Sequence, residues 1–202
     1  MTQNLHDKNK RRLLITTTTT IGTIGIALTA WPFLASLKPS AKTQAAGAPT
    51  EIDISQLQNG QKMTIEWRGK PIWILKRTEK MLTDLKTDTL IAKLRDPDSA
   101  VAEQQPPYAQ NPTRSIKPEY LIVIGICTHL GCSPTYIKEN DPHDLGNHWK
   151  GGFFCPCHGS FFDLAGRVFS GVPAPTNLIV PPHTYLSDTR ILIGIDQNKG
   201  TA

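Results

Sequence analysis

A stretch of 25 residues near the start of the chain, from Leu13 to Leu37, contains no charged residue and constrains the fold more than any other feature. As an α-helix it would be about 37 Å long at about 1.5 Å per residue, enough to cross the roughly 30 Å hydrocarbon core of a bilayer. Five threonines at 16–20 lie inside it. Threonine hydroxyls in a helix can bond to carbonyl oxygens one turn earlier, which limits their cost in lipid. We therefore predict a transmembrane anchor at residues 13–37.

The charges beside this segment indicate its orientation. Basic residues precede it at positions 8, 10, 11 and 12, and the next basic residue is Lys38. Basic flanks stay in the cytoplasm, so residues 1–12 are predicted to be cytoplasmic and the rest of the chain to be exported. The pair Arg11-Arg12 resembles a twin-arginine export signal, a route that carries folded proteins.

A cleaved signal peptide is the alternative to a retained anchor. Residues 46–48 (Ala-Gly-Ala) have the small-x-small form of a cleavage site. This site lies 11 residues beyond Leu37, far from the apolar stretch, so we favour a retained single-pass anchor. Residues 38–50 are small, polar and rich in Pro and Gly, which is typical of a flexible tether.

Composition argues against two classes for the rest of the chain, a nucleic-acid-binding protein and a domain held together by disulfides alone. The net charge is +5, and residues 7–12 contribute +3 of it, which leaves +2 for residues 13–202. So small an excess predicts no nucleic-acid partner. Four cysteines are too few to stabilise a domain of this size by disulfides alone.

Residues 51–202 are predicted to form one β-rich domain, because short alternating or apolar runs are separated by turn residues. Residues 78–94 have helical spacing and predict one or two short helices, and residues 96–117 predict a Pro-rich loop. The fold class is therefore all-β with antiparallel strands. The expected strands lie at residues 51–55, 63–67, 71–76, 120–126, 151–154, 184–186 and 190–196.

Two short motifs contain all four cysteines: CTHLGC at residues 127–132 and CPCHGS at residues 155–160. Each motif holds a Cys and a His at metal-ligand spacing, and each holds one further Cys. The ligand-spaced pairs are Cys127 with His129 and Cys155 with His158, and the further cysteines are Cys132 and Cys157.

The ligand count alone allows two kinds of metal site. Four of these side chains can bind zinc tetrahedrally. Alternatively, Cys127 and Cys155 hold one iron of a 2Fe–2S cluster while His129 and His158 hold the other. An exported chain lies where thiols oxidise, which favours iron, because a Cys-rich zinc site needs all its thiols reduced and the two spare cysteines can pair instead.

The two motifs together match both halves of the Rieske iron–sulfur signature. The sequence GVPAP at residues 171–175 resembles the proline loop that covers the cluster in that family. With the anchor, tether and β-rich body, the whole chain resembles the Rieske iron–sulfur subunit of bacterial ubiquinol–cytochrome c reductases, the cytochrome bc complexes. The resemblance implies an antiparallel Rieske-type β-sandwich with a cluster-binding subdomain, preceded by one transmembrane helix.

The resemblance also implies a role for each motif residue. Cys127 and Cys155 correspond to ligands of the inner iron of one 2Fe–2S cluster, and His129 and His158 to ligands of the outer iron. Cys132 and Cys157 correspond to a disulfide. Ser160 corresponds to a hydroxyl donor to a bridging sulfide, and Leu130 to an apolar residue that shields the cluster near the quinol pocket.

Charge explains why two imidazoles matter in such a site. Two ferric ions, two sulfides and two thiolates sum to zero, whereas four thiolates would give −2, so the mixed ligand set raises the reduction potential. One position departs from the family pattern. Many members have a Tyr two residues after the serine, and here it is Phe162, which predicts a lower potential.

The implied function is electron transfer in a respiratory quinol–cytochrome c reductase. One outer histidine, His129 or His158, takes a quinol proton, and the domain then swings on its tether to a c-type cytochrome. The implied partners are cytochrome b, a c-type cytochrome and quinol, within a dimeric complex at the bacterial inner membrane, with the Rieske domain in the periplasm.

Three alternatives differ in class. The first is the small Rieske subunit of an exported molybdenum oxidase of the arsenite oxidase type. The second is a Rieske oxygenase, which needs a large downstream domain although only 44 residues follow His158. The third is a zinc-binding structural module.

Overall fold

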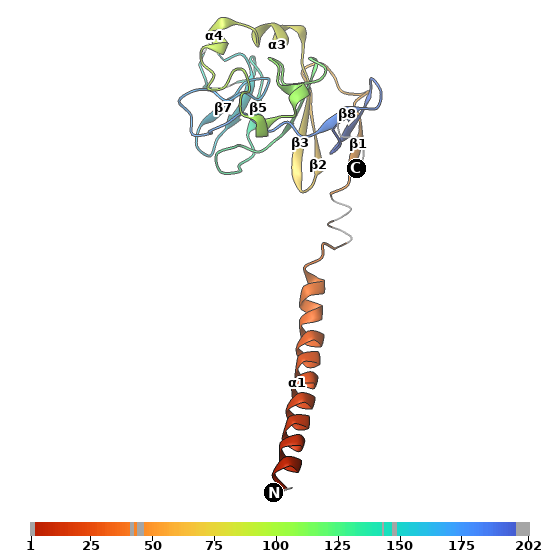
Figure 1. Cartoon of the computed structure of the whole chain (residues 1–202). Helices are drawn as coiled ribbons and strands as arrows, with labels where there is room; N and C mark the ends of the chain where they lie inside the picture. The colour runs from red at the N-terminus through yellow and green to blue at the C-terminus, as the bar shows by residue number, and fades with distance from the viewer. Residues whose placement is uncertain (1–2, 41–42, 44–46, 143, 147–148, 197–202) are drawn as a thin grey trace. The chain divides into compact units, whose positions relative to one another are not determined.

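The computed structural model describes residues 3–40, 43, 47–142, 144–146 and 149–196. The chain divides into two compact units, Met1–Ala45 and Ala46–Ala202, and each is described by itself. Figure 1 shows the long helix of the first unit and the strands of the second.

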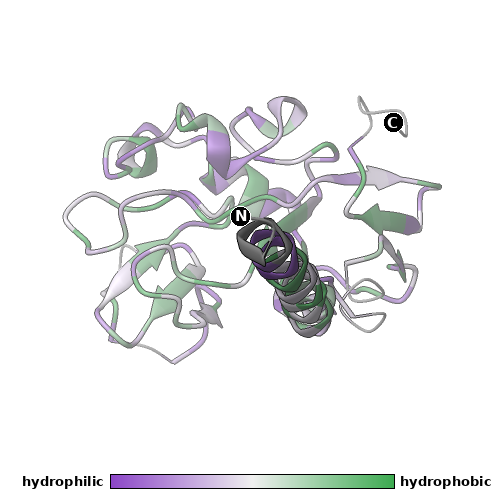
Figure 2. Cartoon of the chain, turned by 60° about the horizontal axis from the view of Figure 1, so that its bottom comes forward, coloured by the Kyte–Doolittle hydropathy of each residue, from purple (hydrophilic) through white to green (hydrophobic). Residues whose placement is uncertain are grey.

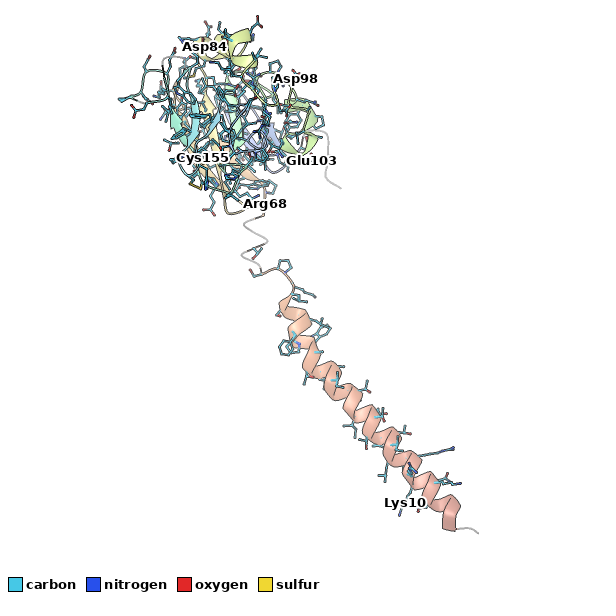
Figure 3. The ribbon with its side chains drawn as sticks, turned by 90° about the vertical axis from the view of Figure 1, so that its left-hand side faces the viewer. Lys10, Arg68, Asp84, Asp98, Glu103 and Cys155 are labelled. Atoms are coloured by element: carbon cyan, nitrogen blue, oxygen red, sulfur yellow. A yellow bond between two sulfur atoms is a disulfide. The ribbon has the colours of Figure 1, made fainter. Side chains whose placement is uncertain are left out.

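The first unit is dominated by α1 (Gln3–Ser36). Within the described residues, one helix is long and apolar enough to cross a membrane, and it spans Asp7–Ser36. Figure 2 shows hydrophobic residues along α1 after a hydrophilic beginning, where Lys10 lies (Figure 3). The threonine hydroxyls do donate to carbonyls one turn earlier, as Thr20 does to Thr16 at 2.9 Å and Thr23 to Thr19 at 2.8 Å. The helix thus satisfies the hydroxyls of five of its threonines internally, those at positions 16, 19, 20, 23 and 29.

In its described residues the second unit contains three small sheets, and the paired strands in them are antiparallel, which confirms the predicted class. The first sheet contains β1 (Thr50–Asp53), β9 (Arg190–Ile193) and β8 (His183–Tyr185), in that order. The second contains β2 (Lys62–Trp67), β3 (Lys70–Lys76) and β4 (Tyr120–Ile124). The third contains β5 (Thr135–Ile137), β6 (Gly152–Cys155) and β7 (Ser160–Phe162).

Short helices lie in the connection between β3 and β4 of the second sheet. The predicted helical region forms α3 (Glu79–Asp84) and α4 (Asp88–Ile91), and the Pro-rich loop contains the 3-10 turns Ala102–Gln104 and Pro107–Ala109. The side chain of Thr78 caps α3 by accepting the backbone N–H of Met81 at 3.2 Å. Figure 1 shows β2 and β3 between β1 and β8 on one side and β5 and β7 on the other.

Strand β3 contributes side chains to both hydrophobic cores of the second unit. Its run Ile72 to Leu75 is buried throughout, and alternate residues face opposite sides of the sheet. Ile72 and Ile74 pack in a core with β1 and β9, whereas Trp73 and Leu75 pack in a second core with β6 and β7. The central sheet is therefore sandwiched between two apolar layers, as the Rieske-type β-sandwich implies.

The start of the second unit is fastened to the hairpin of β2 and β3. Arg68 and Gly69 form its two-residue turn with φ of 53° and 69°. Two positive φ values are typical of the tight turns that match strand twist. The indole N–H of Trp67 donates to the carbonyl of Ala48 at 3.0 Å, and Arg68 donates to that of Gly47 at 3.4 Å. The chain is thus held against the folded unit from Gly47 onward.

Candidate metal centre

The first cysteine motif follows strand β4 through a close backbone passage. Gly125 lies directly after the strand, and a Cβ there would lie 2.2 Å from the ring of Trp73. Only glycine lets the backbone pass over this buried ring. Trp73 in turn stacks on Phe153 of β6, with ring centroids 5.1 Å apart. One aromatic pair therefore supports the approach to both motifs.

The second motif is a hairpin loop. Cys155 ends β6, Ser160 begins β7, and the two residues are paired across the strands. The two motifs also share a local turn: the N–H of Gly131 donates to the carbonyl of Cys127 at 3.1 Å, and that of Gly159 to Cys155 at 2.9 Å. Both glycines have positive φ, 84° and 74°, which ends each turn after the same number of residues.

A disulfide joins the two loops. It links Cys132 to Cys157, 25 residues apart in the sequence. This pairing confirms the one that the resemblance implied. The sulfur atoms of Cys132, Cys155 and Cys157 lie within 4.8 Å of one another, but two of them are bonded together and cannot act as thiolates. The free thiols of the four are those of Cys127 and Cys155.

The two free thiols are buried, with exposed fractions of 2% for Cys127 and 1% for Cys155, and Cys155 lies inside the folded unit (Figure 3). Burial raises the pKa of the Cys127 thiol, and the neighbouring Cys155 adds to this effect. The backbone N–H of His129 and the hydroxyl of Ser160 oppose it, because both donate to the Cys127 sulfur and so stabilise a thiolate. The pocket thus offers two buried sulfur atoms, shielded from water, as metal ligands.

The two histidines lie together toward the solvent side of the thiols. Their ring centroids are 4.7 Å apart and their planes nearly perpendicular, at 88°. His158 is exposed and His129 half-buried. The Nδ1 atom of His129 is a buried polar atom without a hydrogen-bond partner among the described residues. An unpaired buried ring nitrogen is costly unless a ligand occupies it.

A 2Fe–2S cluster fits this arrangement. Two buried sulfurs at one end and two imidazoles at the other are the donors that such a cluster needs when its irons have different ligands. The structure brings together all the motif residues named from the sequence. Leu130 is 70% exposed beside them, and Ser160 is fully buried.

The proline loop lies against both motifs. The N–H of Ala174 donates to the Ser160 hydroxyl oxygen at 3.0 Å, and the Thr128 hydroxyl donates to the carbonyl of Thr176 at 2.7 Å. Sequence analysis identified the loop but not Thr128. A threonine between two ligands has no spacing or charge signal that would distinguish it from a surface residue.

Comparisons with known proteins agree with this geometry. Residues 50–182 match the family described as the Rieske [2Fe-2S] domain. Residues 1–40 match the family described as the ubiquitinol-cytochrome C reductase Fe-S subunit TAT signal.

Curated relatives match over nearly the whole length. The chain is 58% identical to the ubiquinol-cytochrome c reductase iron-sulfur subunit of Allochromatium vinosum over 193 residues. The aligned part is 96% of this chain and 92% of the relative. It is 41% identical to the subunit of Rhodospirillum rubrum, covering 93% of each chain. It is 43% identical to the subunit of Bradyrhizobium diazoefficiens, covering 92% of this chain and 94% of the relative.

Proposed function

Because the chain belongs to the Rieske iron–sulfur subunits that carry electrons in ubiquinol–cytochrome c reductases, we propose that its two motifs hold the 2Fe–2S cluster asymmetrically. Cys127 and Cys155 bind the inner iron, and His129 and His158 bind the outer iron. The observation that carries this assignment is the difference in burial. Both free thiols are buried, while His129 is half-buried and His158 is exposed.

The bound cluster supplies a one-electron carrier between quinol and a c-type cytochrome. The chain's own residues supply the proton chemistry and the docking surface. An imidazole that binds metal through one nitrogen presents the other to its surroundings, so His129 or His158 can accept the hydroxyl proton of a quinol. Leu130 gives the surrounding rim an exposed apolar side chain, which suits contact with the apolar walls of a quinol pocket.

The partners follow from this role. Quinol oxidation in a bilayer requires a membrane subunit that binds quinol, which we propose is cytochrome b, and an electron acceptor, a c-type cytochrome, in a dimeric complex. The identity to reductase subunits over 96% of the chain favours this assembly over a molybdenum oxidase.

The membrane topology is part of the same proposal. The basic residues at positions 8, 10, 11 and 12, in the N-terminal part of α1, favour a cytoplasmic N-terminus and a periplasmic Rieske domain, with the apolar part of α1 retained in the inner membrane. The match of residues 1–40 to a twin-arginine signal supports export of an already folded domain.

Electron paramagnetic resonance (EPR) of the reduced protein in membranes tests the ligand assignment. A 2Fe–2S centre with two histidine ligands gives a low average g value, which zinc and four-cysteine clusters do not. We expect His158→Ala to abolish this signal and His183→Gln, a histidine buried in β8, to retain it. Purified protein without iron or acid-labile sulfide would contradict the proposal.

A further inference from the structure

Arg95 lies 32 residues before the first ligand, outside both motifs, yet its side chain holds the proline loop. Its two terminal nitrogens donate to two carbonyls of the loop, those of Ala174 at 2.6 Å and Val172 at 2.8 Å. A planar guanidinium can make both bonds at once in one fixed orientation. The two carbonyls belong to residues that flank Pro173, so Arg95 fixes the loop on both sides of its central residue.

The backbone around Arg95 is itself paired with the chain that enters the loop. Arg95 N–H donates to the carbonyl of Val168 at 2.9 Å, and Ser170 N–H donates to that of Lys93 at 2.8 Å. Asn177, at the far end of the loop, accepts from Val168 at 2.8 Å and donates to the carbonyl of Asp96 at 3.0 Å. The segment 93–96 is therefore a frame to which both ends of the loop are attached.

Because the loop is fixed by Arg95, its contact with Ser160 is fixed as well. Ala174, whose carbonyl Arg95 holds, is fully buried and uses its N–H to donate to the Ser160 oxygen at 3.0 Å. A serine oxygen that accepts from one side directs its own proton elsewhere. Ser160 is paired with Cys155 across β6 and β7, and its hydroxyl lies within hydrogen-bonding reach of the sulfur of Cys127, so its proton can point to that sulfur.

We propose that Arg95 is a positioning residue for electron transfer: through Val172 and Ala174 it fixes the orientation of the Ser160 hydroxyl toward the sulfur of Cys127. This inference rests on the proposed function and deepens it. A hydrogen bond to sulfur stabilises the reduced state, so the midpoint potential should depend on Arg95 although Arg95 does not touch the cluster.

Redox titration of the full chain in membranes, followed by EPR, tests this. Loss of part of one hydrogen bond is worth about 0.6 kcal/mol, so Arg95→Gln should lower the equilibrium constant for reduction about threefold. At 59 mV per tenfold change for one electron, this is about 30 mV. Arg95→Lys keeps the charge but not the paired donors, and should give a smaller decrease.

The matched control is Lys93→Gln, which removes an equal charge two residues away. Among the described residues its side chain makes no hydrogen bond to the loop, so the potential should change little. A double-mutant cycle with Ser160→Ala separates the two explanations. If Arg95 acts through Ser160, Arg95→Gln should have no further effect in the Ser160→Ala chain.

Several results would overturn the proposal. These are an unchanged potential in Arg95→Gln, an equal decrease in Lys93→Gln, or a decrease that persists in the Ser160→Ala background. Loss of the cluster from both Arg95 variants while Lys93→Gln stays loaded would also overturn it, because Arg95 would then act on cluster retention. Absence of a cluster from the unsubstituted chain would instead contradict the proposed function.

Discussion

At the scale of single residues, the side chains around the two free thiols are apolar or donate hydrogen bonds, and each donor favours added negative charge on sulfur. Ser160 and the backbone N–H of His129 both donate to Cys127. Phe162, two residues beyond Ser160 on β7, is fully buried and contributes a ring without a donor. The electron affinity of the site should therefore respond to a single hydroxyl placed there.

We predict that Phe162→Tyr raises the midpoint potential. The new hydroxyl lies in a buried environment, where a hydrogen bond to a ligand sulfur stabilises the reduced state more than it would in water. A gain of about 1 kcal/mol corresponds to roughly fivefold in the equilibrium constant for reduction. Redox titration followed by EPR measures the change.

Phe161→Tyr is the matched control for this substitution. Phe161 is the preceding residue on the same strand, and its ring packs with those of Trp149 and Phe169 instead. Its hydroxyl should leave the potential unchanged. An unaltered potential in Phe162→Tyr, with the cluster fully loaded, would show that the missing hydroxyl does not set the value.

At the scale of elements, the site depends on how closely β4, β3 and β6 approach one another. Gly125 passes over Trp73, and Trp73 stacks on Phe153, two residues before Cys155. We predict that Gly125→Ala lowers the iron content of purified protein severalfold, because its Cβ would lie 2.2 Å from the Trp73 ring. Overpacking of this kind also lowers the free energy of unfolding by about 1–3 kcal/mol.

A second substitution separates this clash from a general loss of folding. In the double variant Gly125→Ala with Trp73→Leu, the smaller side chain leaves room for the new methyl group, so iron content should recover in part. Iron analysis and a urea unfolding curve give the two measurements. Full loading of Gly125→Ala alone would rule out the close approach as a constraint on the site.

The elements differ in how far the sequence could predict them. Strands such as β3 and β4 were predictable because their apolar runs are bounded by turn residues, and the site was predictable because its cysteines and histidines are dense and regularly spaced. Strands β5 and β7 have three residues each, too few for a periodicity from which to predict a strand. Their existence depends on pairing with β6 in the folded chain.

The burial of three arginines is a second feature that the sequence does not predict. Sequence patterns treat arginine as exposed, yet Arg77, Arg114 and Arg167 are each at most 2% exposed. Arg77 is buried because it donates to the carbonyls of Pro118 and Leu164, at 2.9 and 3.0 Å. Arg167 donates to the carbonyl of Leu85 at 2.9 Å, in addition to its ion pair with the carboxylate of Asp163 at 2.7 Å. Such burial is determined by carbonyls from distant segments, which no local pattern records.

At the scale of the whole molecule, the proposed function requires the domain to reach two partners from one anchor. Residues 38–50 are the predicted tether, and those from Gly47 onward are held by the hairpin of β2 and β3. Residues 38–46 of the predicted tether precede this attachment, and nine residues span at most about 30 Å when extended.

We predict that six prolines at positions 41–46 stop quinol–cytochrome c reduction while leaving the EPR signal of the cluster intact. Proline restricts the backbone to an extended, stiff conformation, which removes the freedom needed to alternate between partners. Six residues of glycine and serine at the same positions are the control and should retain turnover. Normal turnover with the proline tether would refute a swinging domain.

The hydrogen bonds that hold Gly47 and Ala48 also determine which part of the folded unit would bear a mechanical load. A pull from the anchor reaches the folded unit at the carbonyls held by Trp67 and Arg68, and then strand β1 in its ladder with β9. That ladder belongs to a sheet that has no strand in common with the one containing Cys155. A load on the anchor would therefore enter the folded unit at the hairpin of β2 and β3 and at β1, and not at β6 and β7, the hairpin that contains Cys155 and Ser160.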